Sequence, residues 1–264
     1  MIAALPMYFP PKEAVEAFWR ALAQLLRERT DAPIPAALTW PADYHAHWEN
    51  DDFLISQTCG FPLTTVLFDK VQVLGAFAYN APGAEGVNCR SQLICRSTDA
   101  STALADFKGS TLAFNATDSQ SGYNALRALV ASNGDAQPFF GQTVAVGSHG
   151  KSIESVRTGD TDMAAVDCVT LALWQRANPA LAPGLRVFAQ TAPYPGLPLV
   201  TSLATPPHMV AALRESLATV ATDPRFAAVR APLLIGGFAP LELADYAPCL
   251  DMQAQALACG LTTL

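Results

Sequence analysis

Short apolar segments alternate along this chain with segments whose apolar side chains recur at helical spacing. The first such pair is an apolar segment at residues 2–8, followed by a stretch from Val15 to Leu26 in which charged residues separate the apolar ones. Further apolar segments at residues 35–40 and 52–59 flank an expected short helix at residues 44–48. Because strands connected through helices pack as a parallel sheet with helices on its faces, this order predicts an α/β fold.

The same alternation continues through the middle of the chain. A polar stretch with a short helix follows an apolar segment at residues 92–96, and residues 193–202 form a connection punctuated by proline and glycine. Near the C-terminus we expect an apolar loop at residues 233–238. The remaining expected elements are strands at residues 111–116, 142–147 and 162–167, and helices at residues 121–132, 151–159, 209–220 and 245–257.

The length of 264 residues allows two lobes or one large domain. The strand and helix order suggests that residues 95–190 form an inserted α/β lobe, while residues 1–94 and 191–264 together build a discontinuous first lobe. We therefore expect two lobes, each with a mixed, mostly parallel sheet that is flanked by helices.

Charge and hydropathy limit the classes of partner. The net charge is −7, charged residues make up 15% of the chain, and no basic run is present, so nucleic acid is a poor candidate. No segment approaches the ~20 apolar residues of a membrane span, so we expect no membrane insertion. The N-terminal segment lacks the basic start and uninterrupted apolar run of a signal peptide. This favours the cytoplasm, or the periplasm if a signal has been removed.

Cysteine and histidine spacing gives no metal or cofactor signature. The six cysteines form no C-x-x-C pair and most have apolar neighbours, which is typical of buried reduced thiols. Cys249 and Cys259 could pair if the protein were exported. His45 and His47 lack a third ligand at helical spacing, and no phosphate-binding glycine loop or nucleophile elbow occurs. We predict neither a catalytic residue nor a bound metal or cofactor.

The most informative segment runs from Thr111 to Leu126. An expected strand leads into the polar loop at residues 118–122 and directly into a helix. Backbone N–H groups at a helix start have no partner within the helix, and the helix dipole adds partial positive charge there. Ser119 and Ser121 could hold an anion at this point or could simply cap the helix.

A second segment with the same order follows at residues 147–167. His149 and Ser152 lie at another transition from strand to helix. Two helix starts in one lobe would converge at one edge of a parallel sheet, which is where ligands of open α/β sheets bind.

Three motifs in these regions resemble one protein family. The run DFKGSTLAFNATDSQSGYNAL, the block GSHGKSIESVRTGDTDMAAVD and the segment PYPGLPLV resemble, in this order, signature motifs of the phosphate, phosphite and phosphonate substrate-binding proteins of ABC transporters. The resemblance implies a type 2 periplasmic-binding-protein fold, in which two α/β lobes joined by two crossing strands hold the ligand in the cleft between them. It also implies a small oxyanion ligand and an ABC-transporter permease as the partner.

The resemblance also implies the site residues. The serine loop and the histidine of the family hold the phosphonate oxygens, and first-lobe residues close from the other side. Carried over by position, the expected ligand-binding residues are Tyr8, Gln57, Thr58, Ser119, Gln120, Ser121, Gly122, Tyr123, His149, Ser152 and Asp167.

One departure of this chain from the family pattern bears on the charge of the ligand. Leu197 and Val169 occupy the places where aminoalkylphosphonate binders have carboxylates. Asp167 could substitute for them, or could cap the next helix. Two other functions stay open: a cytosolic enzyme on the same fold that acts on a small carboxylate or phosphorylated metabolite, and a ligand-sensing module that docks to another protein.

Overall fold

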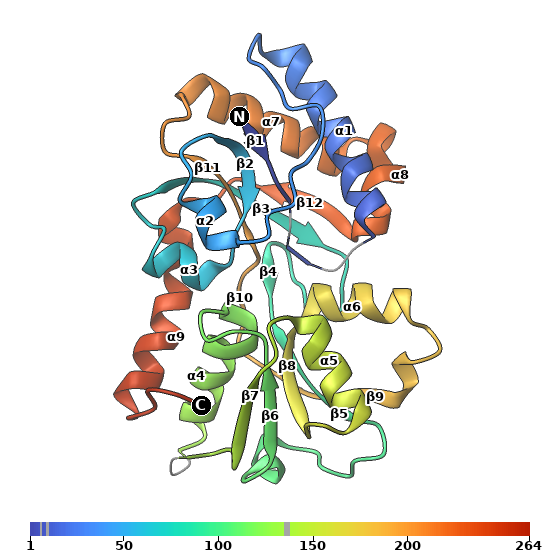
Figure 1. Cartoon of the computed structure of the whole chain (residues 1–264), viewed down its shortest axis with the longest axis vertical. Coiled ribbons are helices and arrows are strands. Elements are labelled where there is room, and N and C mark those ends of the chain that lie inside the picture. The colour runs from blue at the N-terminus through green and yellow to red at the C-terminus, as the bar shows by residue number, and fades with distance from the viewer. Residues whose placement is uncertain (6, 9–10, 135–137) are drawn as a thin grey trace. The chain divides into compact units, whose positions relative to one another are not determined.

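The structure is a computed structural model that describes residues 1–5, 7–8, 11–134 and 138–264. The chain divides into two compact units, which are described separately below (Figure 1). Unit 1 comprises Met1–Asn80, Glu85–Asn88 and Pro195–Tyr246, and unit 2 comprises Ala81–Ala84, Cys89–Tyr194 and Ala247–Leu264. Two short paired strands, β4 (Asn88–Cys89) and β10 (Tyr194–Pro195), lie where the chain passes from one unit to the other.

Unit 1 contains a five-stranded sheet in which β1 and β2 run parallel and the other neighbours run antiparallel. Its strand order is β1 (Ile2–Ala3), β2 (Phe53–Gln57), β11 (Pro198–Ser202), β3 (Val71–Tyr79) and β12 (Ile235–Ala239). The helices of the unit are α1 (Lys12–Arg29), α2 (Tyr44–Trp48), α3 (Gly60–Thr65), α7 (Pro207–Thr222) and α8 (Ala227–Arg230), with 3₁₀ turns at Pro224–Phe226, Ala231–Leu233 and Leu243–Tyr246.

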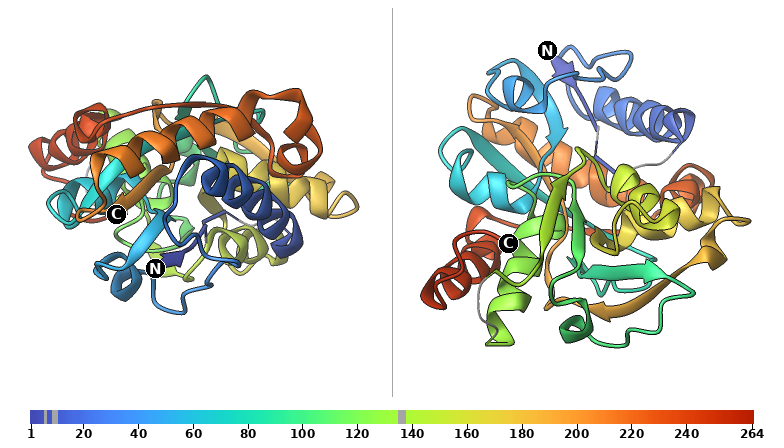
Figure 2. Two further views of the ribbon diagram at one scale, coloured as in Figure 1. Left: turned by 90° about the horizontal axis from the view of Figure 1, so that it is seen from above. Right: turned by 60° about the horizontal axis from the view of Figure 1, so that its bottom comes forward.

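The helical periodicity of the first segment is confirmed by α1. Its buried side chains, from Val15 to Leu26, lie on the face that packs near α7, and both helices appear together in Figure 2. The expected strand at residues 35–40 is wrong, because these residues form no strand. Pro35 has no backbone N–H to donate, and one backbone hydrogen bond, from Thr39 N to Ala3 O at 2.8 Å, connects this segment to β1. Pro6, within the first expected strand, lies outside the described residues.

The expected loop at residues 233–238 is also wrong, since most of it belongs to β12. A glycine in the neighbouring strand β3 allows β12 to approach closely. A Cβ on Gly75 of β3, where φ is +149°, would lie 2.2 Å from the carbonyl oxygen of Ala239 and 2.6 Å from the ring of Phe238. The connection predicted at residues 193–202 likewise contains a strand, β11, which lies between β2 and β3.

Unit 2 contains a second five-stranded sheet, in which β7, β6 and β8 run parallel and β5 pairs antiparallel with β8 and β9. Its strands in order are β7 (Gln142–Ala145), β6 (Thr111–Phe114), β8 (Met163–Asp167), β5 (Ser91–Arg96) and β9 (Leu185–Gln190). Its helices are α4 (Ala125–Ser132), α5 (His149–Thr158), α6 (Cys168–Ala177) and α9 (Ala247–Ala258), with a π-helical turn η2 at Gln120–Asn124 and 3₁₀ turns at Leu104–Phe107 and Ala182–Gly184.

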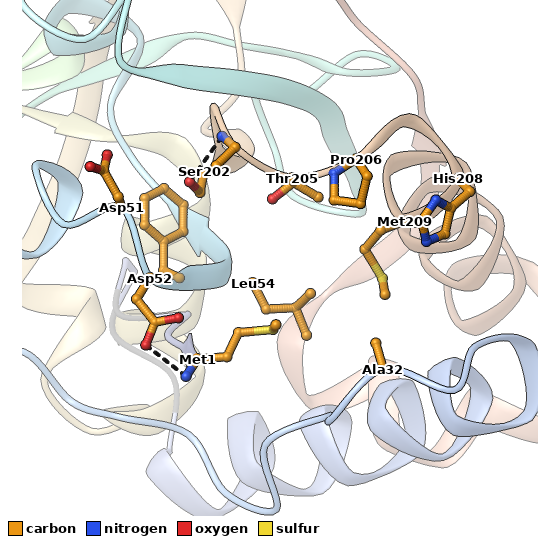
Figure 3. A pocket seen from close by; sticks show the side chains of 12 residues that line it. Met1, Ala32, Asp51, Asp52, Leu54, Ser202, Thr205, Pro206, His208 and Met209 are labelled. Atoms are coloured by element: carbon orange, nitrogen blue, oxygen red, sulfur yellow. Dashed lines mark hydrogen bonds and ion pairs between the residues drawn. The ribbon is translucent and has the colours of Figure 1, made fainter.

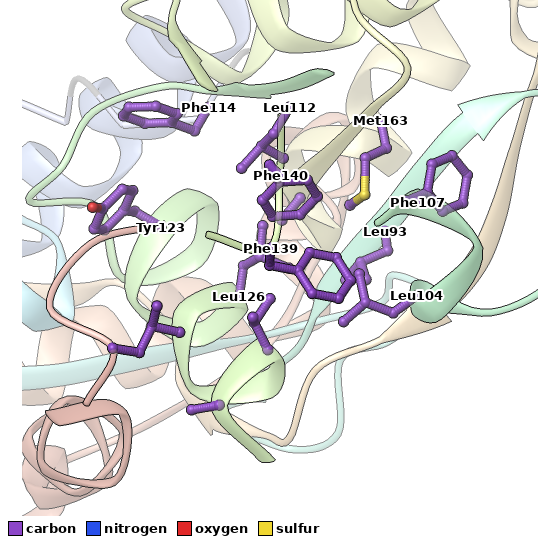
Figure 4. Close-up of a cluster of buried hydrophobic side chains, with 14 of the residues drawn as sticks. Leu93, Leu104, Phe107, Leu112, Phe114, Tyr123, Leu126, Phe139, Phe140 and Met163 are labelled. Atoms are coloured by element: carbon purple, nitrogen blue, oxygen red, sulfur yellow. The ribbon is translucent and has the colours of Figure 1, made fainter. Parts of the chain in front are cut away.

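The central strands of unit 2, β6, β8 and β5, are largely buried because both faces of the sheet are covered there. Alternate residues of a strand point to opposite faces, so Leu112 and Phe114 join one buried cluster while Ala113 joins the other. Figure 4 shows the first cluster, in which Phe139 and Leu126 pack near Leu93 and Met163. The second cluster places Ile153 and Val156 of α5 and Trp174 of α6 against the opposite face.

The two units resemble the expected lobes, but the segments that form them differ from the prediction. Residues 247–264, expected in the first lobe, belong to unit 2. There α9 lies beside α4, as Figures 1 and 2 show, and the side-chain amide of Asn124 donates to the carbonyl oxygen of Cys249 at 2.8 Å. The fold is α/β with two mixed sheets flanked by helices, although parallel pairs are less frequent than we predicted.

None of the six cysteines forms a disulfide, and five of them are buried, while Cys259 is exposed. None of the helices in the described ranges is long and apolar enough to cross a membrane.

Candidate functional site

Two helices of unit 2 begin at the same edge of its sheet. The parallel neighbours β6 and β7 end at this edge, and the chain turns there into η2, which continues as α4, and into α5. Ser119 precedes η2, and its side-chain oxygen accepts a hydrogen bond from Gly122 N at 3.0 Å. Ser148 precedes α5 and caps it through Lys151 N at 3.2 Å, so that His149 is the first residue of the helix.

Polar side chains from the two helix starts meet at this edge. Oγ of Ser121 lies 2.7 Å from Nε2 of His149, and Oγ of Ser119 lies 3.5 Å from Oγ of Ser121. Ser119 and Ser121 are buried, so their hydroxyl groups are largely shielded from bulk water. The serine loop and His149, which are 28 residues apart in the sequence, therefore form one polar cluster, which we call the Ser–His cluster (Ser119, Ser121 and His149).

Gly122 allows this cluster to form because no side chain would fit at its position. A Cβ there would lie 1.9 Å from Oδ1 of Asn115 and 3.1 Å from Cε1 of His149. Both neighbours have buried polar atoms without a hydrogen-bond partner, namely Oδ1 of Asn115 and Nδ1 of His149. Unpaired buried polar atoms are rare in proteins, and two of them beside one glycine indicate a place where a ligand or water supplies the missing partners.

The electrostatics of the cluster favour a neutral imidazole. Burial lowers the pKa of His149 from 6.5 to about 4, because the charged form would lose its hydration. A neutral imidazole donates through one ring nitrogen and accepts through the other. The cluster therefore offers hydroxyl, imidazole and backbone N–H donors at a helix start, which are the groups that bind an anion without a net positive charge.

The shifted pKa of His149 predicts how stability depends on pH. A histidine whose pKa is lower in the folded than in the unfolded chain binds fewer protons when folded. Its stabilising contribution is therefore present above pH 6.5 and is lost as the pH falls toward 4. We expect this loss to be about 2–3 kcal/mol, allowing for partial exposure of the ring. The measurement is urea unfolding of the wild type and of His149→Gln at several pH values between 7 and 4 (about one unit apart).

The control for this measurement is His208→Gln, because His208 is an exposed histidine of unit 1. The His149→Gln variant should lose less stability on acidification than the wild type, whereas His208→Gln should follow the wild type. Equal losses in all three proteins would contradict a neutral, buried His149.

The other residues predicted in unit 2 have different surroundings. Gln120 is directed to the C-terminal helix, where its amide nitrogen lies 3.1 Å from Sδ of Met252. Tyr123 belongs to the hydrophobic core in Figure 4, with its ring 5.1 Å from that of Phe114 and its hydroxyl accepting from Leu264 N. Ser152 is fully buried and donates to Ser148 O at 3.2 Å, within α5. These three side chains are engaged in packing or helix contacts.

Asp167 caps α6, as the alternative interpretation of the sequence suggested. Its Oδ1 accepts hydrogen bonds from Val169 N at 2.8 Å and Thr170 N at 2.9 Å. Burial raises the pKa of its carboxyl group to about 6, while the cap hydrogen bonds act in the opposite direction. Asp167 therefore has a structural role that does not require a ligand.

Two of the three residues predicted in unit 1, Gln57 and Tyr8, contact Tyr79. Nε2 of Gln57 donates to the Tyr79 hydroxyl at 3.5 Å, and the Tyr8 ring packs edge-on against Tyr79 with centroids 5.1 Å apart. Tyr8 has φ of +71°, a conformation that is uncommon outside glycine. Thr58 is completely buried, and its Oγ1 has no hydrogen-bond partner in the part of the chain that the structure describes.

Unit 1 also contains a pocket away from these residues. It has a volume of about 250 Å³ and lies between the start of β2 and the start of α7 (Figure 3). The N-terminal ammonium of Met1 forms an ion pair with Asp52 at its rim, at 2.8 Å. None of the sequence-predicted residues lines this pocket.

Three residues near the Ser–His cluster were missed by sequence reasoning. Asn115 directly follows β6, and its position at the carboxyl end of a strand is a signal that could have identified it. Ser91 donates to Ser121 O at 2.7 Å and lies 2.8 Å from the hydroxyl of Tyr194. Ser91 and Tyr194 carried no such signal, because they approach the loop only through the antiparallel pairing of β5 and the return of the chain at β10.

Comparisons with known proteins agree with this arrangement. A sequence model of a family described as "ABC transporter, phosphonate, periplasmic substrate-binding protein" matches residues 2–246. No curated protein sequence matches the chain.

Solved structures of similar fold include three bacterial proteins. A binding-protein component of an ABC phosphonate transporter from Pseudomonas aeruginosa is 18% identical, with a TM-score of 0.75 over 95% of this chain and 84% of that one. PhnD1 from Prochlorococcus marinus, in complex with methylphosphonate, is 14% identical, with a TM-score of 0.74 over 96% of each chain. A Xanthomonas citri protein bound to ATP is 17% identical, with a TM-score of 0.71 over 98% of this chain and 97% of that one.

The solved structures establish the fold, a type 2 periplasmic-binding-protein fold. The family match covers most of the chain, including the Ser–His cluster and both sheets. This protein therefore belongs to the family of periplasmic phosphonate-binding proteins of ABC transporters, which is a family of binding proteins rather than of enzymes.

Proposed function

We propose that this protein binds a small phosphorus oxyanion, such as a phosphonate, phosphate or phosphite, at the Ser–His cluster and delivers it to an ABC-transporter permease. The observation that carries the proposal is the contact of 2.7 Å between Ser121 Oγ and His149 Nε2 at the start of two helices. A ligand oxygen placed there would accept hydrogen bonds from both side chains. These would replace the hydrogen bond between Ser121 and His149.

The chemistry of the cluster suits an oxyanion better than a cation or an apolar ligand. Hydroxyl and backbone N–H donors at a helix start stabilise negative charge, and the helix dipole adds to this effect. His149 is neutral near pH 7, because its pKa is about 4, so it contributes a hydrogen bond rather than a charge. This supports recognition through directed hydrogen bonds instead of ion pairing.

We propose Thr58, Gln57 and Tyr8 as the ligand-binding residues of unit 1. Thr58 is the strongest of these candidates, because its buried hydroxyl oxygen has no partner in the structure. A ligand oxygen that accepts from this hydroxyl would remove the cost of an unpaired buried group, about 1–3 kcal/mol.

The ligand is expected to lack an amine. Val169 and Leu197, at the places where aminoalkylphosphonate binders have carboxylates, carry no charge. An ammonium group would therefore lose its hydration without gaining a carboxylate partner, which is unfavourable. We expect alkylphosphonates and inorganic phosphorus anions to bind more tightly than aminoalkylphosphonates.

A thermal-shift panel tests the proposal. The ligands are phosphate, phosphite, methylphosphonate, an aminoalkylphosphonate, sulfate, an aromatic carboxylate and ATP. A ligand at about 100 times its Kd adds ~2.7 kcal/mol of stability. For a chain of this size the melting temperature should rise by roughly 5–10 °C.

The variants Ser121→Ala and His149→Ala should abolish the shift, whereas the exposed Ser97→Ala should keep it. A shift with ATP or the carboxylate alone would replace the phosphorus oxyanion by another ligand class. An unchanged shift in Ser121→Ala would move the site away from the Ser–His cluster.

A further inference from the structure

Three metal-ligating side chains of unit 2 meet outside the Ser–His cluster. Cys89 lies on β4, Asp167 is the last residue of β8, and Cys168 is the first residue of α6. Their thiol sulfurs and carboxylate oxygen all lie within 4.8 Å of one another. The side chains are 1%, 5% and 1% exposed, respectively, so the group is almost completely enclosed.

The carboxylate of Asp167 has no cationic partner. Among the described residues, Asp167 accepts hydrogen bonds from the backbone N–H groups of Val169 and Thr170 and from the side chain of Thr170, and no lysine, arginine or histidine forms an ion pair with it. A buried carboxylate is costly unless it is paired with a cation or coordinates a metal. Both cap hydrogen bonds go to Oδ1, so a cation bound at Oδ2 would leave the cap of α6 in place.

Among the described residues, no lysine, arginine or histidine is a cause of the pKa shift of Asp167 or of Tyr194. The hydroxyl of Tyr194 lies close enough to Asp167 and Cys89 for their charges to raise its pKa, although burial is the larger cause. Tyr194 also contacts Ser91, which is neutral, at 2.8 Å. The enclosed group thus combines two thiols, a carboxyl group and a phenol, all of which would be stabilised as anions by a cation.

We propose that Cys89, Cys168 and Asp167 bind a thiophilic divalent cation of the zinc and cadmium class. Two thiolates and one carboxylate are a ligand set that zinc accepts in proteins, with water in the fourth position. In a tetrahedral zinc site the ligand atoms are about 3.5–3.8 Å apart, given bond lengths of about 2.0–2.3 Å. The present separations of up to 4.8 Å require the side chains to move by about 1 Å or less, which rotation about their χ angles can supply.

Binding would release protons and stabilise unit 2. Each cysteine that coordinates the cation loses its thiol proton to solvent, so the site takes up the divalent cation while up to two protons leave. The cation would connect β4 to the junction of β8 and α6, which are far apart in the sequence. This site uses none of the residues of the Ser–His cluster, and it goes beyond the proposed oxyanion binding.

Cadmium titration of the full chain tests the site directly. The experiment uses reduced, metal-free protein that carries Cys259→Ser, because the exposed thiol of Cys259 could bind metal on its own. Cadmium bound to thiolates produces an ultraviolet charge-transfer absorption, which we expect to saturate at one equivalent per chain. Cys89→Ser and Cys168→Ser, added to this background, should each remove most of the absorption, and Asp167→Asn should weaken cadmium binding at least tenfold.

Cys95→Ser is the matched control, because Cys95 is a buried thiol of the same unit outside the group. It should keep the absorption and the stoichiometry. Circular dichroism establishes which variants fold. If a variant does not fold, the melting temperature of the folded proteins with and without added zinc is measured instead of the absorption. We expect zinc to raise the melting temperature of the wild type, of the Cys259→Ser background and of Cys95→Ser.

Three results would overturn the proposal. The first is a folded, reduced protein that shows no charge-transfer absorption with cadmium. The second is an absorption that persists in both Cys89→Ser and Cys168→Ser. The third is a chain that binds no cadmium when reduced and that forms a disulfide between Cys89 and Cys168 under mild oxidation. Phosphonate binding is measured separately, so its failure would leave the metal result unaffected.

Discussion

Replacing Gly122 by alanine is expected to abolish oxyanion binding and to destabilise unit 2 by about 1–3 kcal/mol. The added Cβ would lie 1.9 Å from Oδ1 of Asn115 and 3.1 Å from Cε1 of His149, so at least one of these side chains must move. A movement of His149 breaks its contact of 2.7 Å with Ser121 and separates the groups proposed to hold the ligand. Isothermal titration with methylphosphonate and urea unfolding measure the two effects.

Gly184→Ala is the matched control, since a Cβ at Gly184 meets no atom within 4 Å. We expect it to leave both affinity and stability close to the wild type. The double variant Asn115→Ala and Gly122→Ala should recover part of the stability, because it removes the nearest clashing atom while the contact with His149 remains. A Gly122→Ala protein with wild-type affinity would show that the Ser–His cluster does not bind the ligand.

Removing residues 247–264 is also expected to have a large effect, namely a loss of stability of unit 2. This segment supplies α9 and the C-terminal turn, whose buried Met252, Ala256 and Leu261 contact unit 2. Its loss would also remove two hydrogen bonds at 2.8 Å, from the side-chain amide of Asn124 to Cys249 O and from the guanidinium of Arg127 to Thr262 O. Burial of a large apolar side chain contributes about 1.5–3 kcal/mol and a hydrogen bond about 0.5–1.5 kcal/mol, so we expect a total loss of at least about 4 kcal/mol.

Hydrogen exchange is the measurement for this truncation, because it reports on unit 2 without assuming that both units unfold together. Amides of α4 and β6 should exchange faster in the truncated protein, while those of β3 in unit 1 should keep their protection. Asn133→Ala is a control at the exposed end of α4 and should change little. Unchanged protection of α4 in the truncated chain would contradict the role of α9. Affinity for the anion should fall with stability, since α9 contacts η2 through Met252 and Gln120.

The family match ends at residue 246, immediately before this segment. The C-terminal helix therefore lies outside the matched residues, and it contacts the turn that carries Ser121. Its effect on the proposed binding site is indirect, through packing rather than through ligand contact.

The sequence by itself predicted the elements whose local pattern is strong. Helical periodicity identified α1 and α7, because one face of each helix packs against the core and the other meets water. The order of strand, polar loop and helix identified the serine loop and His149, because parallel strands bring their carboxyl ends to one edge. The structure shows that these two segments do meet, with Ser121 and His149 in hydrogen-bond contact.

The tertiary structure decided what depends on partners far along the chain. The glycines of β12 suggested a loop, and only its pairing with β3 makes it a strand. Residues 247–264 were assigned to the wrong lobe, because an amphipathic helix does not specify which apolar surface it covers. Cys89, Asp167 and Cys168 form a group only because β4 returns beside the end of β8. Local patterns determine which residues form an element, whereas contacts across long sequence separations determine its neighbours, and such contacts leave no periodic signal in the sequence.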